Sequence, residues 1–394
     1  MTEKGKFLME SALKTAVTVM PDCVEEILRR LNREGFDAYV VGGCVRDLLM
    51  GKKPSDWDVC TSAEPDEIKR CFTDFETLDI GMRHGTVAVF VGKLTVEITT
   101  YRVDGPYTDG RRPDSVAFTK SLTEDLARRD FTVNAMAFHP EKGLADPFGG
   151  QTDLQKRQIR CVGEPEKRFS EDGLRIMRGL RFSSVLGFEI TVPTEEAMRR
   201  CVSLTEKVSR ERISVELSKL ILGFDVDRVM RQYGDILKFA VKGFWPASVA
   251  YLPKILPVRL AVVFPENTET CLQDLKYSGQ IVSQASRLNR LATGGQPKTP
   301  VEIRKLVAKE GEELAGLYFS MLGREKDFQK VVESGVCCSL RSLAVDGTDL
   351  IDAGVPQGKE VGMLLSELLN LVMEEKLDND RDTLLKYVQG RTKS

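Results

Sequence analysis

The sequence predicts an α+β fold, in which a head with a small mixed sheet precedes a long region of helices. Strand-like alternation is confined to roughly the first 150 residues, and beyond them apolar residues recur at helical spacing. We expect four parts, which we call the head (1–150), the neck (151–222), the body (223–330) and the tail (331–394).

The head is expected to alternate helices with strands. Its first helix should span 22–34, where four apolar residues recur at helical spacing before Gly35. Strand, helix, strand, helix and hairpin should follow in the segments DAYVVGG, VRDLLMG, DVCT, PDEIKRCF and GTVAVFVGKLTVEITTYR. The head should end near the turn DPFGG at 146–150, and the neck, body and tail should be helical.

Composition limits the class of protein. The 394 residues, 42% hydrophobic and 29% charged, describe a globular protein of several domains without a membrane span. Nine cysteines without C-x-x-C spacing favour reduced thiols, and the N-terminus is too polar for a signal peptide, so we expect a cytoplasmic protein. Only His84 and His139 are present, which excludes a multi-histidine metal centre such as a His-Asp phosphohydrolase site.

The net charge is −2, so a nucleic-acid partner would need a local basic face. Residues 156–219 offer one, with 14 lysines and arginines against 10 acids. A solvated helical face is the commoner meaning of such a segment.

Two carboxylates, Asp56 and Asp58, follow the glycine-rich turn in VVGGCVRDLLMGKKPSDWDVC. On an extended segment both side chains face the same way and repel each other, unless a hard cation such as Mg²⁺ lies between them. Gly43 and Arg46, just upstream, suit the approach of phosphates. A D-x-D pair alone is common on solvated loops, but this combination predicts a site for a metal and a nucleoside triphosphate.

Glu97 is a candidate third carboxylate, because its apolar neighbours Val96 and Ile98 should point to the opposite face of a strand. A solvent-facing glutamate is the alternative. With two metal ions, such a set would permit in-line nucleotidyl transfer.

The run LARRDFTVNAMA offers Arg129 as a phosphate clamp, and Asp130 and Asn134 for ribose hydroxyls. The alternative is an ordinary helix start with an acid in its first turn.

In RFSEDGLRIMRGLRF, one acid and three arginines recur at a spacing of three, which is typical of a stripe along a helix. A salt-bridged surface helix would show the same pattern. The first pair, Asp172 and Arg175, has a sharper use. A carboxylate and a guanidinium together match the amino group and acceptor of cytosine or adenine, and leave polar groups unpaired against guanine or uracil.

The motifs GGCVRD, DWD, RHGTVAV, VEITTYR, RRDFTVNAMA, DPFGG, EDGLR and ERISVEL follow one another in this order. The chain thereby resembles the bacterial class II tRNA nucleotidyltransferases, the family of CCA-adding enzymes and poly(A) polymerases. The resemblance is close over 38–222, and the tail run SLAVDGTDLIDAGVPQGKEVG is similar as well.

The resemblance implies a polymerase-β-like nucleotidyltransferase palm in the head, base recognition in the neck, and tRNA binding in the tail. It also implies a mobile loop at about 78–84, with Arg83 as its basic residue. The implied roles are Mg²⁺ binding for Asp56 and Asp58 with Glu97 as third carboxylate, triphosphate and ribose binding for Gly43, Arg46 and Arg129, base reading for Asp172 and Arg175, and assistance in the nucleotide pocket for Arg178 and Arg181.

The implied reaction is template-free addition of C, C and A to tRNA 3′ ends from CTP and ATP. The loop is not visibly deleted, which favours full CCA addition over CC addition alone. A poly(A) polymerase, a CC-adding or A-adding specialist and a catalytically silent RNA-binding relative remain alternatives. We expect tRNA, CTP and ATP as partners and a monomer or homodimer.

Overall fold

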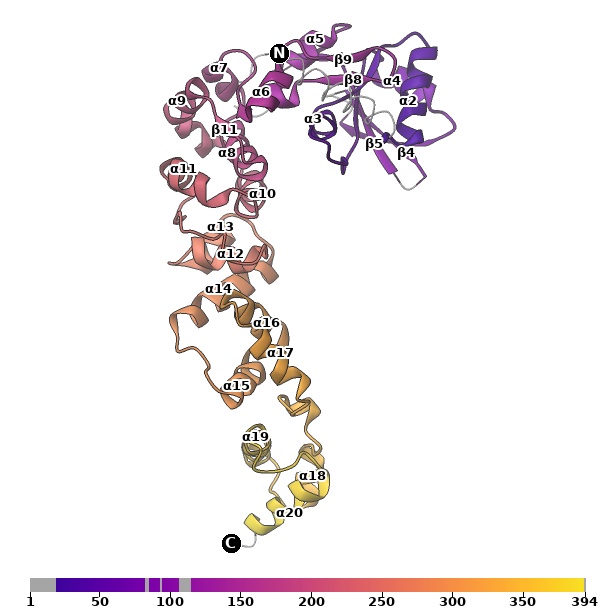
Figure 1. Cartoon of the computed structure of the whole chain (residues 1–394). Coiled ribbons are helices and arrows are strands. Elements are labelled where there is room, and N and C mark those ends of the chain that lie inside the picture. Colours follow the sequence, from indigo (N-terminus) through magenta and orange to yellow (C-terminus); the bar gives the residue numbers. More distant parts are fainter. Residues whose placement is uncertain (1–18, 82–84, 93, 106–114, 393–394) are drawn as a thin grey trace. The chain divides into compact units, whose positions relative to one another are not determined.

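The computed structural model describes residues 19–81, 85–92, 94–105 and 115–392, and it divides into two compact units, 1–246 and 247–394 (Figure 1). The division into head, neck, body and tail stays a prediction. In the described part of the chain, no helix is both long and apolar enough to cross a membrane.

A seven-stranded mixed sheet organises the first unit, as the sequence predicted. Its order is β3-β4-β5-β2-β1-β8-β9, and β2 and β5 are parallel while the other neighbours are antiparallel. The strands are β1 (Ala38–Val41), β2 (Asp58–Thr61), β3 (Glu76–Gly81), β4 (Thr86–Val91), β5 (Leu94–Thr100), β8 (Ala137–His139) and β9 (Gly143–Ala145). A separate pair joins β6 (Arg102–Asp104) to β7 (Val116–Phe118).

The helices expected in the head are confirmed: α2 (Asp22–Arg33), α3 (Gly43–Leu49) and α4 (Pro65–Cys71). The apolar face of α2 is buried through Val24, Ile27, Leu28 and Leu31. It packs with α3, α4 and one face of the sheet in a single core. A smaller core on the other face includes Val41, Cys60 and Leu126, the last from α5 (Leu122–Ala127).

Part of the segment expected as a mobile loop is a strand. Residues 78–81 belong to β3, which pairs with β4 across a register shift between Leu78 and Gly81. The run ETLDIG has no apolar alternation strong enough to indicate a strand, and backbone pairing at the sheet edge supplies the structure instead. Arg83 lies outside the described residues.

The rest of the first unit is helical, as expected, apart from the short pair β10 (Gln158–Ile159) and β11 (Glu189–Ile190). Residues 226–240, which the sequence placed in the body, form helix α11, which packs on α8 (Leu174–Leu186) and η3 (Val202–Lys207). The elements are η2 (Thr132–Asn134), α6 (Gly150–Lys156), α7 (Pro165–Glu171), α8 (Leu174–Leu186), α9 (Val192–Cys201), η3 (Val202–Lys207), α10 (Arg210–Ile221) and α11 (Val226–Ala240).

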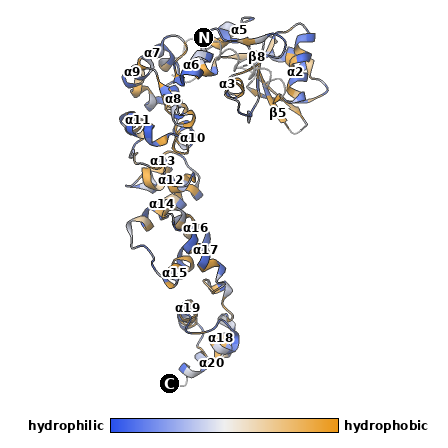
Figure 2. Cartoon of the chain, viewed as in Figure 1, coloured by the Kyte–Doolittle hydropathy of each residue, from blue (hydrophilic) through white to orange (hydrophobic). Residues whose placement is uncertain are grey.

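The regular elements in the described part of the second unit are helices, which together carry both hydrophobic and hydrophilic residues (Figure 2). Its C-terminal helices share a core that includes Leu350, Leu368 and Leu384. The elements are α12 (Leu256–Val263), α13 (Thr268–Asp274), α14 (Gly279–Thr293), α15 (Pro300–Glu310), α16 (Glu312–Met321), α17 (Glu325–Glu333), η4 (Leu340–Ser342), α18 (Gly347–Asp352), α19 (Lys359–Met373) and α20 (Arg381–Thr392).

Candidate active site

The two aspartates of the D-x-D pair lie at the start of β2. Trp57 between them is buried at 6% exposure, whereas Asp56 and Asp58 are both exposed. This alternation places both carboxylates on one side of the extended segment, as the spacing predicted.

Glu97 lies directly beside this pair. Strands β2 and β5 run parallel, and Asp58 is the register partner of Glu97. Val96 and Ile98 are buried in the core beneath α2, so Glu97 points away from that core. The sheet therefore brings together two acids that are 39 positions apart in the sequence.

The charge on Asp58 is unfavourable in the folded chain. Although this residue keeps an exposed surface, surrounding protein removes water from its carboxyl and raises its pKa. The carboxylates of Glu97 and Asp56 raise the pKa further, and Arg129 acts in the opposite direction. A cation bound between the carboxylates would relieve this repulsion.

The acids suit a cation that takes only part of its coordination from protein. Among the described residues, no group of three or more histidine, cysteine, aspartate or glutamate side chains is assembled to hold a metal ion. Two carboxylates are nevertheless sufficient for an ion that keeps water and substrate phosphates in its shell. Asp56 and Asp58 fit such an ion, and Glu97 stands beside them without completing a closed cage.

The glycine turn allows an arginine to approach the backbone. Gly42 has φ +82°, and a Cβ atom there would lie 3.1 Å from Nη1 of Arg129. Asp125, which is fully buried, lies 3.4 Å from Nη2 of Arg129. Burial opposes the charge on Arg129, but Asp125, Cys60 and Asp58 together outweigh burial and raise the pKa of Arg129. The Nε of Arg129 is buried without a hydrogen-bond partner among the described residues, which leaves a donor for an anion.

A chain of polar contacts links α3 to α8. Arg46 donates from Nη1 to Oδ1 of Asn134 at 2.6 Å, and Asn134 donates to Oδ1 of Asp130 at 3.3 Å. Arg178 on α8 donates from Nε to Oδ2 of Asp130 at 2.7 Å, and its Nη2 lies 2.7 Å from the same oxygen. The sequence predicted these four residues as nucleotide ligands, and the structure brings them together in one network.

Protein donors occupy most of the carboxylate of Asp130. Its Oδ1 accepts from the backbone N–H of Phe131 and from Asn134, and its Oδ2 accepts from Nε of Arg178, whose Nη2 lies 2.7 Å away in an ion pair. Its burial opposes ionisation, but Arg178, Arg175 and the N–H of Phe131 together outweigh burial and lower the pKa of Asp130 to about 2. Asp130 therefore holds Arg178 in place.

Asp172 pairs with a residue that we did not predict. Arg212 on α10 donates to both of its oxygens, from Nη1 to Oδ1 at 3.2 Å and from Nη2 to Oδ2 at 2.6 Å. The backbone N–H of Leu174 also donates to Oδ1 at 3.1 Å. These three bonds leave one of about four acceptor positions open, on Oδ2.

Arg175 is buried and partly engaged by protein. Its Nη1 donates to the carbonyl of Arg168 and to the carboxylate of Glu171, and its Nη2 donates to the carbonyl of Arg128. A guanidinium has five N–H donors, so two of them have no acceptor among the described residues. Asp172 and Arg175 thus keep one acceptor and two donors between them for a ligand.

Arg178 and Arg181 share a buried acid, Glu216 of α10. Its carboxylate lies 2.6 Å from Nε of Arg181 and 3.7 Å from Nη1 of Arg178. The guanidinium carbons of Arg46, Arg178 and Arg181 also lie 5.4, 5.4 and 3.8 Å from the centre of the Phe182 ring. Cations at such distances from a ring face are attracted to it.

Arg212 and Glu216 were missed as site residues by sequence reasoning. The motif ERISVEL contains both, but nothing in its spacing says which residues of another helix they contact. Their role depends on the packing of α10 against α8.

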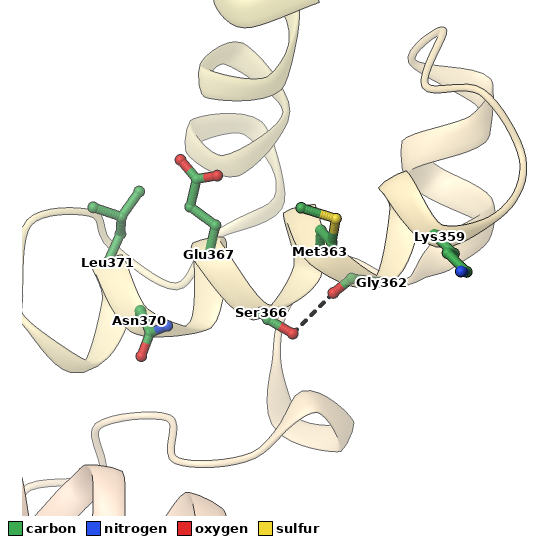
Figure 3. A pocket seen from close by; sticks show the side chains of 7 residues that line it. All are labelled: Lys359, Gly362, Met363, Ser366, Glu367, Asn370 and Leu371. Carbon is green, nitrogen blue, oxygen red and sulfur yellow. Dashed lines mark hydrogen bonds between the residues drawn. The ribbon is translucent and has the colours of Figure 1, made fainter.

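A hollow lies along α19 in the second unit (Figure 3). It is open, has a volume of about 690 Å³, and is lined from one helix by residues that include Lys359, Met363 and Glu367. Glu367 is engaged with Tyr387 and Arg391. The hollow offers no pair of groups for catalysis, so the candidate active site is the cluster in the first unit.

Three family profiles match the chain. The profile of the poly A polymerase head domain matches residues 38–160, and a profile described as a probable RNA and SrmB-binding site of polymerase A matches 187–234. A third profile, tRNA nucleotidyltransferase domain 2 (putative in its description), matches 258–388.

Curated relatives extend the match to nearly the whole chain. The CCA-adding enzymes of Lactobacillus helveticus and Enterococcus faecalis are each 35% identical to it, over 92% and 95% of this chain and 95% and 97% of their own lengths. The crystal structure of the Bacillus stearothermophilus CCA-adding enzyme in complex with CTP superposes with a TM-score of 0.80 at 30% identity, covering 94% of this chain and 97% of that one. With relatives this similar over this length, the chain belongs to the family of CCA-adding enzymes.

Proposed function

We propose that this protein adds C, C and A to the 3′ ends of tRNA without a template, using CTP and ATP and releasing pyrophosphate. The observation that carries the proposal is the paired carboxylates beside Glu97, with the arginines of α8 held in one polar network with α3. The relatives named above are CCA-adding enzymes, which favours this activity over a poly(A) polymerase or a CC-adding or A-adding specialist.

In this proposal Asp56 and Asp58 hold a divalent cation, which we take to be Mg²⁺ because the donors are carboxylate oxygens and phosphates complete the shell. When bound, the ion neutralises charge that develops on the transferred phosphoryl group and the leaving pyrophosphate. Glu97 adds negative charge beside Asp58 and strengthens the attraction for the cation.

The remaining residues position the nucleotide. The Nε–H of Arg129 has no hydrogen-bond partner among the described residues and suits a phosphate oxygen. The turn at Gly42 and Gly43 keeps the backbone close to Arg129. Arg46 and Arg178 are held in orientation by Asn134 and Asp130. With the triphosphate fixed, the RNA 3′-hydroxyl attacks the α-phosphate in line and pyrophosphate leaves.

Base choice is assigned to Asp172 and Arg175. The open position on Asp172 Oδ2 accepts the amino group of cytosine or adenine, and the two open N–H groups of Arg175 donate to the neighbouring ring acceptors. Guanine and uracil present a carbonyl to Asp172 instead, and the resulting buried acceptors go unpaired.

The likeness to a tRNA complex of the Thermotoga maritima CCA-adding enzyme, at 18% identity and a TM-score of 0.69, supports the fold alone. We propose that tRNA contacts the neck, body and tail, and that the protein acts as a monomer or homodimer in the cytoplasm.

The test is an Asp58→Ala variant assayed with tRNA that ends before its CCA sequence. We expect nucleotide transfer to be abolished while the tRNA dissociation constant stays within about threefold of the native value, because Asp58 lies in the acid cluster. Extension of RNA by this variant at the native rate would refute the metal assignment, and so would unchanged activity of the native protein after removal of divalent cations by a chelator.

A further inference from the structure

Asp172, Arg175, Arg178 and Arg181 recur every third residue, and we call the three arginines of this set the arginine row. One face of α10 carries charges opposite to those of Asp172 and of the arginine row. Arg212 and Glu216 are four residues apart, so they lie on the same side of the helix, which packs on α8. Arg212 meets the acid Asp172, and Glu216 meets the bases Arg178 and Arg181. This arrangement goes beyond two separate ion pairs, since each charge of α10 is opposite in sign to the charge that it contacts on or beside α8.

The contact of Arg212 with Asp172 fixes a geometry as well as a charge. A planar guanidinium that donates to both oxygens holds the plane of the carboxylate, which a single hydrogen bond would leave free to rotate. The side chain of Asp172 is 14% exposed, so the fork acts in a partly desolvated place. Because two N–H groups of Arg212 donate to the carboxylate, Asp172 stays an acceptor, with one lone-pair position on Oδ2 left for a ligand.

The contact of Glu216 has a different consequence. Glu216 is only 6% exposed, and its carboxylate lies beside the guanidiniums of Arg178 and Arg181. Burial lowers the pKa of Arg181, the positive charges of Arg178 and Arg46 act in the same direction, and Glu216 opposes them. Without this acid, three neighbouring cations would repel one another and lose their shared position around the Phe182 ring.

We propose that Arg212 and Glu216 are positioning residues with separate effects: Arg212 sets the base choice through Asp172, and Glu216 sets the affinity for either nucleotide through Arg178 and Arg181. This inference rests on the proposed function, since it assigns the base to Asp172 and the nucleotide to the arginine row. Neither residue touches the substrate in this account.

The test compares kcat/KM for CTP and UTP on tRNA that ends before its CCA sequence. Arg212→Met is expected to lower the CTP-over-UTP ratio at least tenfold, because the carboxylate of Asp172 loses its fixed plane. Arg212→Lys keeps the charge without the fork, so it should lower the ratio as well. Glu216→Gln should raise KM for CTP and ATP about tenfold with the CTP-over-UTP ratio unchanged.

The matched control is Lys219→Met, which removes a positive charge from an exposed position of the same helix and should leave the ratio and both KM values unchanged. Equal losses of kcat/KM for CTP and UTP in both Arg212 variants would overturn the role of Arg212, because a merely structural residue gives that result. A lowered KM in Glu216→Gln would overturn the role of Glu216. If the native protein itself fails to prefer CTP to UTP, the proposed function fails, whereas a native preference that survives in both Arg212 variants refutes only this inference.

Discussion

At the scale of single residues, the ionised carboxylate of Asp58 destabilises the folded chain. Its pKa is raised by partial burial and by Glu97 and Asp56, so the folded state binds a proton more tightly than the unfolded state does. The stability of the metal-free protein therefore falls as the pH rises from the unfolded pKa through the folded one. A carboxyl placed this way is typical of functional sites.

We therefore predict that Asp58→Asn raises the melting temperature in metal-free buffer near pH 7, by about 2–4 °C for each kcal/mol of repulsion removed. The same variant should lose nucleotide transfer. Calorimetry with and without a divalent cation checks this, and the cation should stabilise the native protein more than the variant. Asp66→Asn, at an exposed position in the first turn of α4, serves as the control and should give no rise.

Asp130 has the opposite electrostatics. Its pKa is lowered to about 2, despite burial, chiefly by Arg178, so its ion pair contributes stability above the unfolded pKa and loses it as the pH falls toward the folded one. A shift from 3.8 to about 2 corresponds to about 2 kcal/mol.

We predict that Asp130→Asn is destabilised by about 2 kcal/mol at pH 7, because Arg178 keeps its charge but loses its carboxylate. Urea unfolding between pH 2 and pH 7 measures this difference, which should shrink below about pH 4 as Asp130 of the native protein becomes protonated. A difference that stays constant over that range would show that Asp130 contributes through hydrogen bonding alone.

The sequence was sufficient for the residues whose role depends on local spacing. The D-x-D spacing predicted that Asp56 and Asp58 share a side, and the apolar neighbours of Glu97 predicted its orientation; burial and register agree. The partner of Asp172 could not be predicted in the same way. Arg175 stands three residues away, yet Arg212, 40 positions along the chain, makes the fork. Tertiary packing determines which distant residues pair, and the local sequence pattern does not predict that packing.

At the scale of elements, the turn before α3 determines how closely Arg129 approaches the backbone. Gly42 combines φ +82° with ψ −126°, a conformation in which residues with a Cβ are strained by about 1–3 kcal/mol. A methyl group there would also meet Nη1 of Arg129 at 3.1 Å.

For this reason Gly42→Ala is expected to destabilise the protein by about 1–3 kcal/mol and to raise KM for CTP and ATP together, since Arg129 must move away. Denaturant unfolding and steady-state kinetics measure the two effects. Gly51→Ala is a useful control, because Gly51 has φ +69° but no atom within 4 Å of the added Cβ. That variant should lose stability without a change in KM.

Regular elements were predicted where periodicity was strong. Helix α2 and the hairpin of β4 and β5 agree with their patterns, because each buries one face against a core. Strand β3 was missed, since it is an edge strand with largely exposed side chains and gains its order from pairing with β4. The short pair of β10 and β11 was missed for a similar reason, as two residues carry no period.

At the scale of the whole molecule, every described residue proposed to bind the nucleotide or metal lies in the first unit. These residues lie in or next to β2, β5, α3, η2 and α8. The sequence predicted the mixed sheet followed by helices and the family, and the comparisons confirm both. The first unit ends at Pro246 and includes α11, which packs on α8.

CCA addition is measured most directly by supplying the purified protein with tRNA that ends before its CCA sequence, Mg²⁺, and labelled CTP and ATP, singly and together. We expect CTP alone to extend the RNA by two residues and a third residue to be added only when ATP is also present. A long ladder with ATP alone would contradict it in favour of a poly(A) polymerase, two cytidines without a final adenosine would indicate a CC-adding specialist, and no extension with any mixture would leave only a silent RNA-binding relative.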